Sequence, residues 1–265
     1  MYNFNYQKAT SRDDAISARS SADDGSYLAG GMTLIPTLKQ RLAKPSDVID
    51  LAAIDDLAGI TDDGGAITIG AMTTHAAVAN SDVVASKIPA LAALAGHIGD
   101  PQVRNRGTIG GSIANNDPAA DYPAGCVGLN ATIITNKREI SADDFFTDLF
   151  ETVLEDGELI TAVSFPVADK AAYAKFPNPA SRYAIVGVMV AQTGGETRAA
   201  VTGASQSGVY RAADIEAALG DGLDAAAAKA VKVSADGLNS DIHASAEYRA
   251  HLISIMASRA AAAAG

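Results

Sequence analysis

The stretch 102–121, QVRNRGTIGGSIANNDPAAD, places the pair Gly110-Gly111 between Thr108 and Ser112, ahead of a run of Asn and Asp. Glycine lets a backbone pass close to a ligand and lets successive N–H groups point the same way. The hydroxyl groups of Thr108 and Ser112 add hydrogen-bond donors, and such groups suit a pyrophosphate. A tight turn without a ligand is the alternative, since Gly pairs are common in turns. The stretch matches neither the G-x-G-x-x-G fingerprint nor the P-loop.

A second stretch of this kind lies upstream at 29–36, AGGMTLIP. Here Gly30-Gly31 follows a short apolar run, and Thr33 supplies a hydroxyl group two positions later. The same two interpretations apply, an anion-binding loop or a tight turn.

The residues around these stretches alternate short β-type runs with helical patterns, which indicates an α+β chain. Strands are expected at 26–29, 47–51, 66–70, 131–135 and 159–165. Helices are expected at 13–20, with Ser11 as a possible N-cap, and at 73–80, 88–98 and 120–129, the last capped by Asp117.

The last third of the chain reads as a small α+β domain. Residues 167–182 hold several prolines and are expected to form a linker. A hairpin of strands at 183–192 and 197–204 follows, turning at Gly194-Gly195. Helices are expected at 212–219, at 224–235 and from about 244 onward, with 260–265 frayed.

Charge and cysteine content exclude several classes of protein. The net charge of −11 argues against a nucleic-acid or anionic-membrane partner, because both need a positive surface. The single cysteine, Cys126, cannot ligate an iron–sulfur cluster or form an internal disulfide, and a reducing cytoplasmic location is expected. The sequence contains no run of 18 apolar residues, so no membrane span is expected, and its first residues lack the apolar core of a signal peptide.

Three motifs carry a resemblance to a known family. They are 29–45 (AGGMTLIPTLKQRLAKP) with VIDL at 48–51, the stretch 102–121, and 241–251 (DIHASAEYRAH). In this order they resemble the FAD-binding medium subunits of molybdenum hydroxylases, the family of carbon monoxide dehydrogenase and xanthine dehydrogenase. The run NNDPAA at 115–120 resembles the carbon monoxide dehydrogenase-like branch most.

The resemblance implies a fold of the vanillyl-alcohol-oxidase (PCMH) type, in which two α+β subdomains hold an extended FAD. The first subdomain would span 1–57 and the second 58–166. A C-terminal α+β domain of the kind found in carbon monoxide dehydrogenase flavoproteins would span 172–265.

The resemblance also implies which residues contact FAD. The pyrophosphate would be wrapped by Ala29, Gly30, Gly31, Met32 and Thr33 together with Thr108, Gly110, Gly111 and Ser112. Asp121 would hold the adenosine ribose, Asn115 would add a polar contact, and Ile160 would contact the adenine end. Ile98 and Tyr183 would lie at the isoalloxazine. Asp121 as a helix start, Ile160 as a core strand residue and Tyr183 as a core residue are the structural alternatives. Arg182 and Lys175 are weaker candidates for flavin contact.

The remaining reactive residue types are expected to be structural. His75, His97, His243 and His251 lack metal-ligand spacing, and Cys126 lies in an apolar stretch. No catalytic side chain and no metal ligand are therefore predicted. Arg104 and Arg106 are candidates for ion pairs or for a partner contact.

The resemblance implies an electron-transfer subunit in a dimer of heterotrimers. A molybdenum-binding large subunit and a small subunit with [2Fe-2S] clusters would complete the enzyme, and quinone, NAD or another acceptor would take the electrons. Two alternatives are a free-standing flavin oxidase or dehydrogenase of the same fold and a flavin-free binding module.

Overall fold

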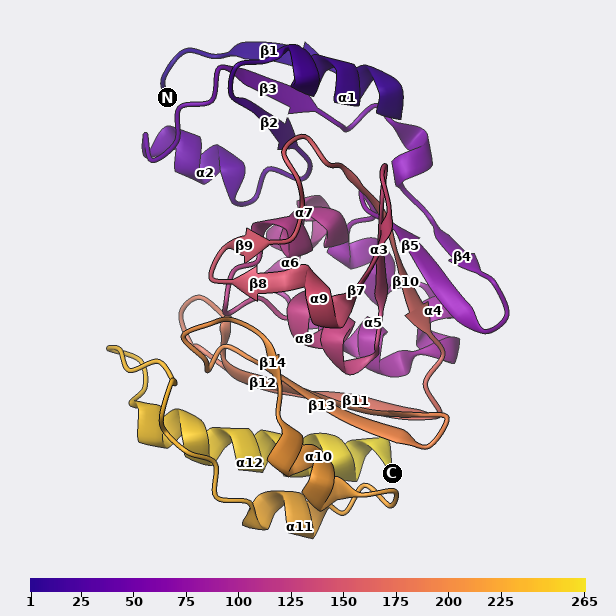
Figure 1. The fold of residues 1–265 in the computed structure, drawn as a ribbon, viewed down its shortest axis with the longest axis vertical. Coiled ribbons are helices and arrows are strands. Elements are labelled where there is room, and N and C mark those ends of the chain that lie inside the picture. The colour runs from indigo at the N-terminus through magenta and orange to yellow at the C-terminus, as the bar shows by residue number, and fades with distance from the viewer.

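The computed structural model describes residues 1–265 and shows three layers stacked along the long axis of the molecule (Figure 1). An N-terminal sheet lies at one end, a central sheet with its helices in the middle, and a C-terminal sheet with its helices at the other end. Three clusters of buried apolar side chains form the core, and the central cluster extends onto the C-terminal sheet through Tyr173 and Met189. None of the helices combines the length and apolar character that crossing a bilayer requires.

The N-terminal layer is a parallel sheet in the order β1-β3-β2. Parallel neighbours need crossover connections, and the two helices of this layer lie in them. The elements are β1 (Asn5–Lys8), α1 (Arg12–Ser21), β2 (Gly25–Leu28), α2 (Leu34–Lys39) and β3 (Asp47–Asp50), followed by a 3-10 turn at Asp55–Leu57. Ser11 caps α1 as expected, by accepting a hydrogen bond from the backbone N of Asp14. The first glycine stretch leaves the sheet where the edge strand β2 ends.

The central layer is an antiparallel sheet in the order β4-β5-β10-β6-β7. Its strands are β4 (Ile60–Asp62), β5 (Ala66–Gly70), β6 (Thr132–Thr135), β7 (Glu139–Ser141) and β10 (Ile160–Pro166). Seven helices accompany it, namely α3 (His75–Ala79), α4 (Asp82–Lys87), α5 (Pro89–Gly96), α6 (Pro101–Arg106), α7 (Ile109–Asn115), α8 (Tyr122–Gly128) and α9 (Ala142–Phe145). A small hairpin of β8 (Phe146–Asp148) and β9 (Glu151–Thr152) completes this layer.

The C-terminal layer is an antiparallel sheet in the order β11-β12-β13-β14 with helices on one face. The strands are β11 (Lys170–Pro177), β12 (Ala184–Thr193), β13 (Glu196–Thr202) and β14 (Tyr210–Arg211). The helices are α10 (Ala213–Leu219), α11 (Ala225–Ala230) and α12 (Ala246–Ala264). The long helix α12 packs on β11 and β12, while the other face of the sheet meets α8 of the central layer.

Most expected strands are confirmed, but the linker at 167–182 is wrong. Residues 170–177 form β11, which pairs with β12 along its whole length. Pairing with the neighbouring strand outweighs the two prolines, of which Pro177 is the last residue of β11 and Pro179 follows it, because strand pairing is decided by tertiary context. Each sheet lies within one of the three predicted domains, except that β11 begins at Lys170, two residues before the predicted start of the C-terminal domain at 172. The domain boundaries themselves stay predictions.

Three helix ends also differ from expectation. The helix expected at 120–129 begins at Tyr122, and Asp117 does not cap it but accepts a hydrogen bond from the backbone N of Ala119. The helix expected at 224–235 ends at Ala230, where β-branched Val231 begins extended backbone. The tail at 260–265 is helical to Ala264, because Ala260 and Ala261 are buried against the C-terminal core.

Candidate functional site

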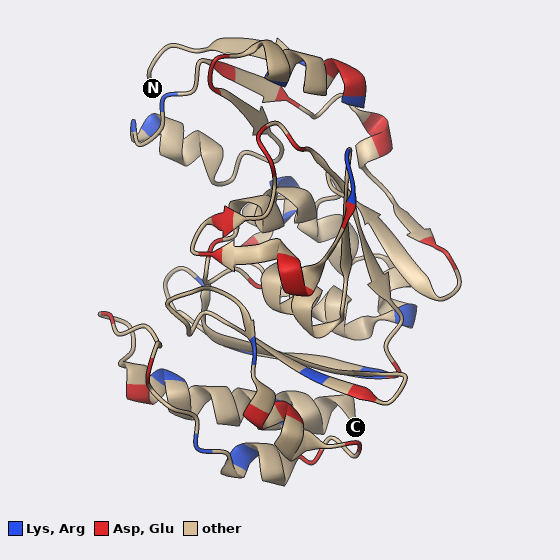
Figure 2. Cartoon of the chain, in the orientation of Figure 1, with Lys and Arg blue, Asp and Glu red and all other residues tan.

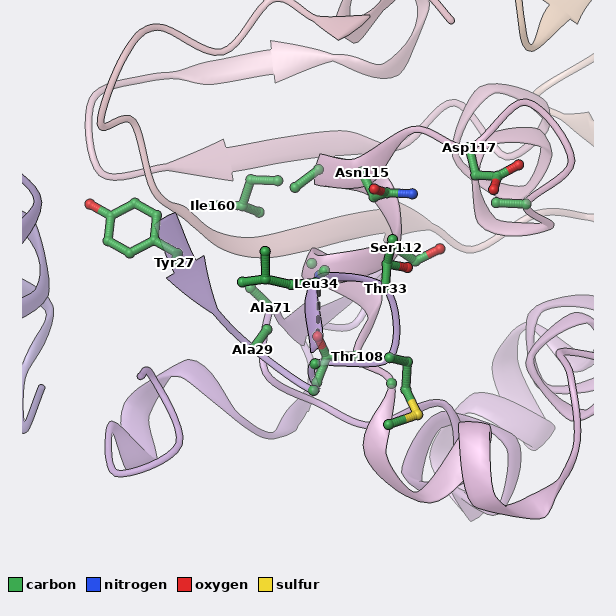
Figure 3. A pocket seen from close by; sticks show the side chains of 18 of the residues that line it. Tyr27, Ala29, Thr33, Leu34, Ala71, Thr108, Ser112, Asn115, Asp117 and Ile160 are labelled. Atoms are coloured by element: carbon green, nitrogen blue, oxygen red, sulfur yellow. Dashed lines mark hydrogen bonds between the residues drawn. The ribbon is translucent and has the colours of Figure 1, made fainter. Parts of the chain in front are cut away.

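One large cavity separates the N-terminal layer from the central layer. Its volume is about 890 Å³, at the upper end of the roughly 300–1,000 Å³ typical of ligand sites. Every residue predicted to contact a cofactor lines it except the weaker candidate Lys175, and Figure 3 shows side chains from both layers and from the two glycine stretches around it. The structure thus brings together residues that lie more than 150 positions apart in the sequence, such as Ala29 and Tyr183.

The two glycine stretches touch one another at the cavity. A Cβ atom placed on Gly30 would lie 1.9 Å from the carbonyl oxygen of Arg106 and 2.9 Å from the Cα atom of Gly107. No side chain fits in that space, so only glycine allows this close approach. Gly31 has a φ of +74°, a conformation that other residues rarely adopt. Glycine at these two positions is therefore required by the contact and the turn.

The first glycine stretch offers its backbone donors to the cavity. The N–H groups of residues 29–34 have no hydrogen-bond acceptor in the chain. A bundle of unpaired N–H groups next to an open cavity is an anion-binding arrangement, since each dipole presents a partial positive charge. The side chain of Thr33 makes no capping hydrogen bond to α2 and also lines the cavity.

The second glycine stretch has its donors already in use, contrary to the expectation that they wrap a pyrophosphate. The N–H groups of Ile109 and Gly110 donate to the carbonyl oxygens of Thr73 and Ala71, at 3.1 and 2.9 Å. The N–H of Gly111 donates to the side-chain oxygen of Thr108 at 3.1 Å. The N–H of Ser112 donates to the Thr108 carbonyl at 3.0 Å. These N–H groups are therefore already bonded, within α7 or to the segment 71–75. What remains for a ligand in this stretch is its side chains.

Two side chains of the second stretch are free to meet a ligand. The hydroxyl group of Ser112 and the amide group of Asn115 line the cavity and make no hydrogen bond within the chain. Figure 3 shows Ser112 and Asn115 from the second stretch and Thr33 from the first among the residues that line the pocket. These polar groups complement the unpaired backbone donors of the first stretch.

One end of the cavity is formed where the N-terminal layer meets the segment before β10. Ile160 and Tyr27 both line the cavity, Ile160 from the start of β10 and Tyr27 from β2 (Figure 3). The hydroxyl group of Tyr27 donates to the carbonyl of Gly157 at 3.1 Å, and Arg19 pairs with Asp156. This segment closes the cavity across the two layers and holds that end together.

The opposite end of the cavity is formed by Ile98, Gly99, Asp121, Arg182 and Tyr183. Asp121 is 4% exposed and accepts hydrogen bonds from the hydroxyl group of Tyr173 at 2.5 Å and from Nζ of Lys175 at 2.9 Å. Burial raises the pKa of Asp121, and the Lys175 ammonium and the Tyr173 hydroxyl oppose that shift. Lys175 also donates to the carbonyl of His97 at 3.2 Å.

This arrangement bears on the role expected for Asp121, which stays a prediction. An adenosine contact at Asp121 would require it to share an end with Ile160, but Lys175 ties Asp121 to His97, the neighbour of Ile98. Asp121 therefore belongs with the residues expected at the isoalloxazine. Its carboxylate is engaged by Lys175 and Tyr173, and Lys175 itself lies behind Asp121 and does not line the cavity. Arg182 does line it, with φ of +63° and a 3.5 Å hydrogen bond to the Gly99 carbonyl.

The cavity carries little positive charge. Its ionised side chains are two arginines and six carboxylates, namely Arg19, Arg182, Asp100, Asp117, Asp121, Glu155, Asp156 and Glu158. Figure 2 shows acidic residues spread over all three layers. A phosphorylated ligand must therefore be held by dipoles and hydroxyl groups rather than by a field of positive charge.

Sequence reasoning missed several residues of the cavity wall. Tyr27 and Arg19 carry no motif, and residues 154–158 form a turn whose only signal is Asp156-Gly157. His75, expected to be structural, lines the cavity and is buried, whereas His243 and His251 are exposed. Cys126 is fully buried among apolar side chains, as expected, and burial raises its pKa.

Comparisons with known proteins agree with this geometry. Residues 2–168 match the family described as the FAD binding domain in molybdopterin dehydrogenase. The nicotine 6-hydroxylase medium subunit of Paenarthrobacter nicotinovorans is 34% identical, over 94% of this chain and 92% of the relative. The carbon monoxide dehydrogenase medium chain of Afipia carboxidovorans is also 34% identical, over 97% and 95%.

Solved structures extend the likeness to the whole fold. A carbon monoxide dehydrogenase from Hydrogenophaga pseudoflava superposes with a TM-score of 0.89 at 33% identity, over 99% of this chain and 97% of that one. Quinoline 2-oxidoreductase from Pseudomonas putida 86 superposes with a TM-score of 0.88 at 29% identity. The predicted PCMH-type α+β fold, the oxidoreductase class and the cofactor FAD are thereby confirmed. The chain belongs to the FAD-binding medium subunits of the molybdenum hydroxylases.

Proposed function

We propose that this chain is the electron-transfer subunit of a molybdenum hydroxylase, passing electrons from a partner's iron–sulfur clusters to an external acceptor. FAD, when bound, supplies this chemistry because it can take up electrons singly and release them in pairs. The observation that carries the proposal is the large cavity, which is lined both by the turn with unpaired amides at 29–34 and by the half-exposed Tyr183.

The cavity fits FAD in the distribution of its polar groups. The unpaired N–H groups of 29–34, with Thr33, Ser112 and Asn115, would hold the pyrophosphate. Ile160 would contact the adenine end. Ala29, Gly30, Gly31 and Met32 would contribute backbone contacts from the first stretch. Thr108, Gly110 and Gly111 would contribute packing contacts from the second stretch, because their N–H donors are used within the fold. The close approach at Gly30 supports this placement, because it brings both stretches to one side of the cavity.

The other end would hold the isoalloxazine. Ile98 and Tyr183 provide apolar and aromatic surface there, and 46% of Tyr183 is exposed, so it can meet an acceptor or a partner chain from outside. The ion pair of Asp121 with Lys175 fixes the carboxylate in place beside this end. No side chain of this chain is assigned to proton transfer with a substrate, so no catalytic residue is proposed.

The assembly belongs to the same proposal. Relatives named as medium chains or medium subunits imply partner chains, and a dimer of heterotrimers with a molybdenum-binding large subunit and a [2Fe-2S] small subunit is proposed. Quinone or NAD is proposed as acceptor, and the cytoplasm as location. One relative is named for nicotine and another for carbon monoxide, and each is 34% identical to this chain. Similarity of this chain therefore does not follow the substrate, and we assign substrate binding to the partner chain.

A free-standing flavin oxidase is the alternative from another class of function. It would need a separate substrate pocket beside the flavin. A smaller cavity next to the large one measures about 180 Å³ and is lined by Gly30 and Arg106, where the same two stretches meet. Its size and position favour the subunit interpretation. No observation favours a flavin-free binding module.

The proposal is tested with the chain alone and with its partners. We expect the purified chain to take up about one FAD per chain, and co-expression with the neighbouring large and small subunit genes to give a complex containing molybdenum and iron. Substrate turnover by the isolated flavoprotein would contradict the subunit role. A folded chain that gains no flavin on titration would contradict the whole proposal.

A further inference from the structure

His75 occupies an unusual place between the two layers of the cavity wall. It is the first residue of α3, which Thr74 caps, and only 4% of it is exposed. Its backbone N donates to the carbonyl of Gly107 at 2.9 Å, next to the bonds from Ile109 and Gly110 back to 71–75. The backbone of His75 is thus anchored to Gly107 within the second glycine stretch.

The imidazole ring has no hydrogen-bond partner in the chain. Its Nε2 atom lies against Gly107, where an added Cβ would approach it to 2.5 Å, and both residues line the cavity. Its Nδ1 atom is buried without a partner. The ring of Tyr122 lies 5.3 Å away, centroid to centroid, and its hydroxyl group is also buried and unpaired. Unpaired polar atoms in a core are rare and call for an explanation.

The ring is neutral, which fixes what it can offer. Burial, with a smaller contribution from Arg104, lowers the pKa of His75 from 6.5 to about 4. A neutral imidazole carries one proton, either on Nδ1 or on Nε2. Nδ1 has no partner in the chain in either tautomer, so the ring presents a donor to the cavity only when its proton is on Nε2. A hydrogen bond to a ligand therefore needs the tautomer with its proton on Nε2, beside Gly107 at the cavity wall.

We propose that His75 is a cofactor-binding residue whose Nε2–H donates a hydrogen bond to a phosphate oxygen of FAD. Phosphate oxygens only accept, so a neutral N–H is complementary to them and adds no charge to an acidic cavity. The contact replaces the backbone donors of the second glycine stretch, which the fold has used internally. The inference rests on the proposed FAD site and assigns one more residue to it.

The first test separates hydrogen bonding from packing. His75→Leu removes both nitrogens, whereas His75→Gln keeps an N–H donor near the position of Nε2. We expect His75→Leu to raise the Kd for FAD by about tenfold or more, the effect of one hydrogen bond to a charged group. His75→Gln should stay within about threefold of the wild-type chain. The matched control is His251→Gln, because His251 is exposed on α12 in the C-terminal layer.

Each outcome decides the proposal. A Kd for His75→Leu close to the wild-type value, or a folded His75→Gln that binds as weakly as His75→Leu, would overturn it. If the wild-type chain itself binds no FAD, the proposed function fails instead, and the two failures are distinguishable.

A second measurement uses only the wild-type chain, in case the variants do not fold. With ¹⁵N-labelled histidine, we expect one resonance pair of a neutral Nε2–H tautomer, and its proton should move downfield when FAD is added. Adenosine, which has no phosphate, should not produce that shift. A histidine spectrum unchanged by FAD, or the same shift with adenosine, would contradict the phosphate contact.

Discussion

The two glycine stretches look alike in sequence and differ in what they offer the cavity. The first, at 29–34, leaves its N–H groups unpaired. In the second, the N–H groups of 109–112 donate to acceptors within the chain, namely Thr108 and the segment 71–75. A Gly-Gly pair followed by a hydroxyl residue therefore does not by itself show that the backbone N–H groups are free to bind a ligand.

The difference follows from where each stretch lies. The first leaves an edge strand at the end of β2 and turns through Gly31 with positive φ, and none of its N–H groups donates to a backbone acceptor. The second runs antiparallel to 71–75 and then enters α7, and each of those neighbours accepts its donors. In the proposed FAD site the first stretch would bind the pyrophosphate with its backbone, and the second would position Ser112, Asn115 and the contact with Gly30.

The largest expected effect comes from the contact between the stretches. In Gly30→Ala the new Cβ would meet the Arg106 carbonyl at 1.9 Å, and backbone cannot yield as a side chain can. We expect the free energy of unfolding to fall by about 3 kcal/mol, the upper range for overpacking, and FAD to be lost. Chemical denaturation and flavin content after purification measure both.

The matched control for this change is Gly65→Ala, at a position with open space around it. It should change neither stability nor flavin content measurably. A Gly30→Ala protein that keeps wild-type stability and flavin would show that the two stretches do not need to touch.

The next effect is the response of the second stretch to acid. The folded state keeps the pKa of His75 near 4, against 6.5 for an exposed imidazole. Between pH 6.5 and pH 4, the unfolded chain therefore binds a proton at His75 that the folded chain does not bind. Stability must fall as pH drops from 6.5 to 4, by up to about 3 kcal/mol from this group. The measurement is the difference in free energy of unfolding between wild type and His75→Gln across that range. A constant difference would show that His75 is not held neutral at the second stretch.

Much of this molecule could be predicted from its sequence, because local patterns and local structure agree. The runs at 47–51, 66–70 and 131–135 are strands, and the glycine stretches meet at one cavity. What could not be predicted depends on neighbours distant in sequence. The strand β11 is formed by pairing with β12, and Asp121 is placed by Lys175, 54 residues away. The unpaired state of one set of amides and the paired state of the other also depend on such neighbours.

A smaller effect is expected when the threonine of each stretch, Thr108 or Thr33, is replaced. Thr108 caps α7 by accepting from Gly111 N, whereas Thr33 makes no capping bond. Thr108→Ala should lower stability by about 1 kcal/mol, the usual cost of a lost cap. Thr33→Ala should leave the melting temperature unchanged and weaken FAD binding. Thermal unfolding of both apoproteins checks this, and equal losses of stability would mean that the two stretches have the same structural role.

The smallest effect is expected at Ser112. Its hydroxyl group makes no hydrogen bond within the chain, so Ser112→Ala should not change stability. It should raise the Kd for FAD by about fivefold, as for one ordinary hydrogen bond of roughly 1 kcal/mol. Fluorescence titration of the apoprotein measures it, and unchanged affinity would remove Ser112 from the proposed contacts.

The most direct test of the contrast is amide hydrogen exchange, measured residue by residue with and without FAD. The account predicts that amides 109–112 are protected from exchange in the apoprotein and stay so. Amides 29–34 should exchange fast in the apoprotein and become protected when FAD binds. Amides 109–112 that exchange freely without FAD and gain protection with it, while 29–34 do not change, would contradict the account.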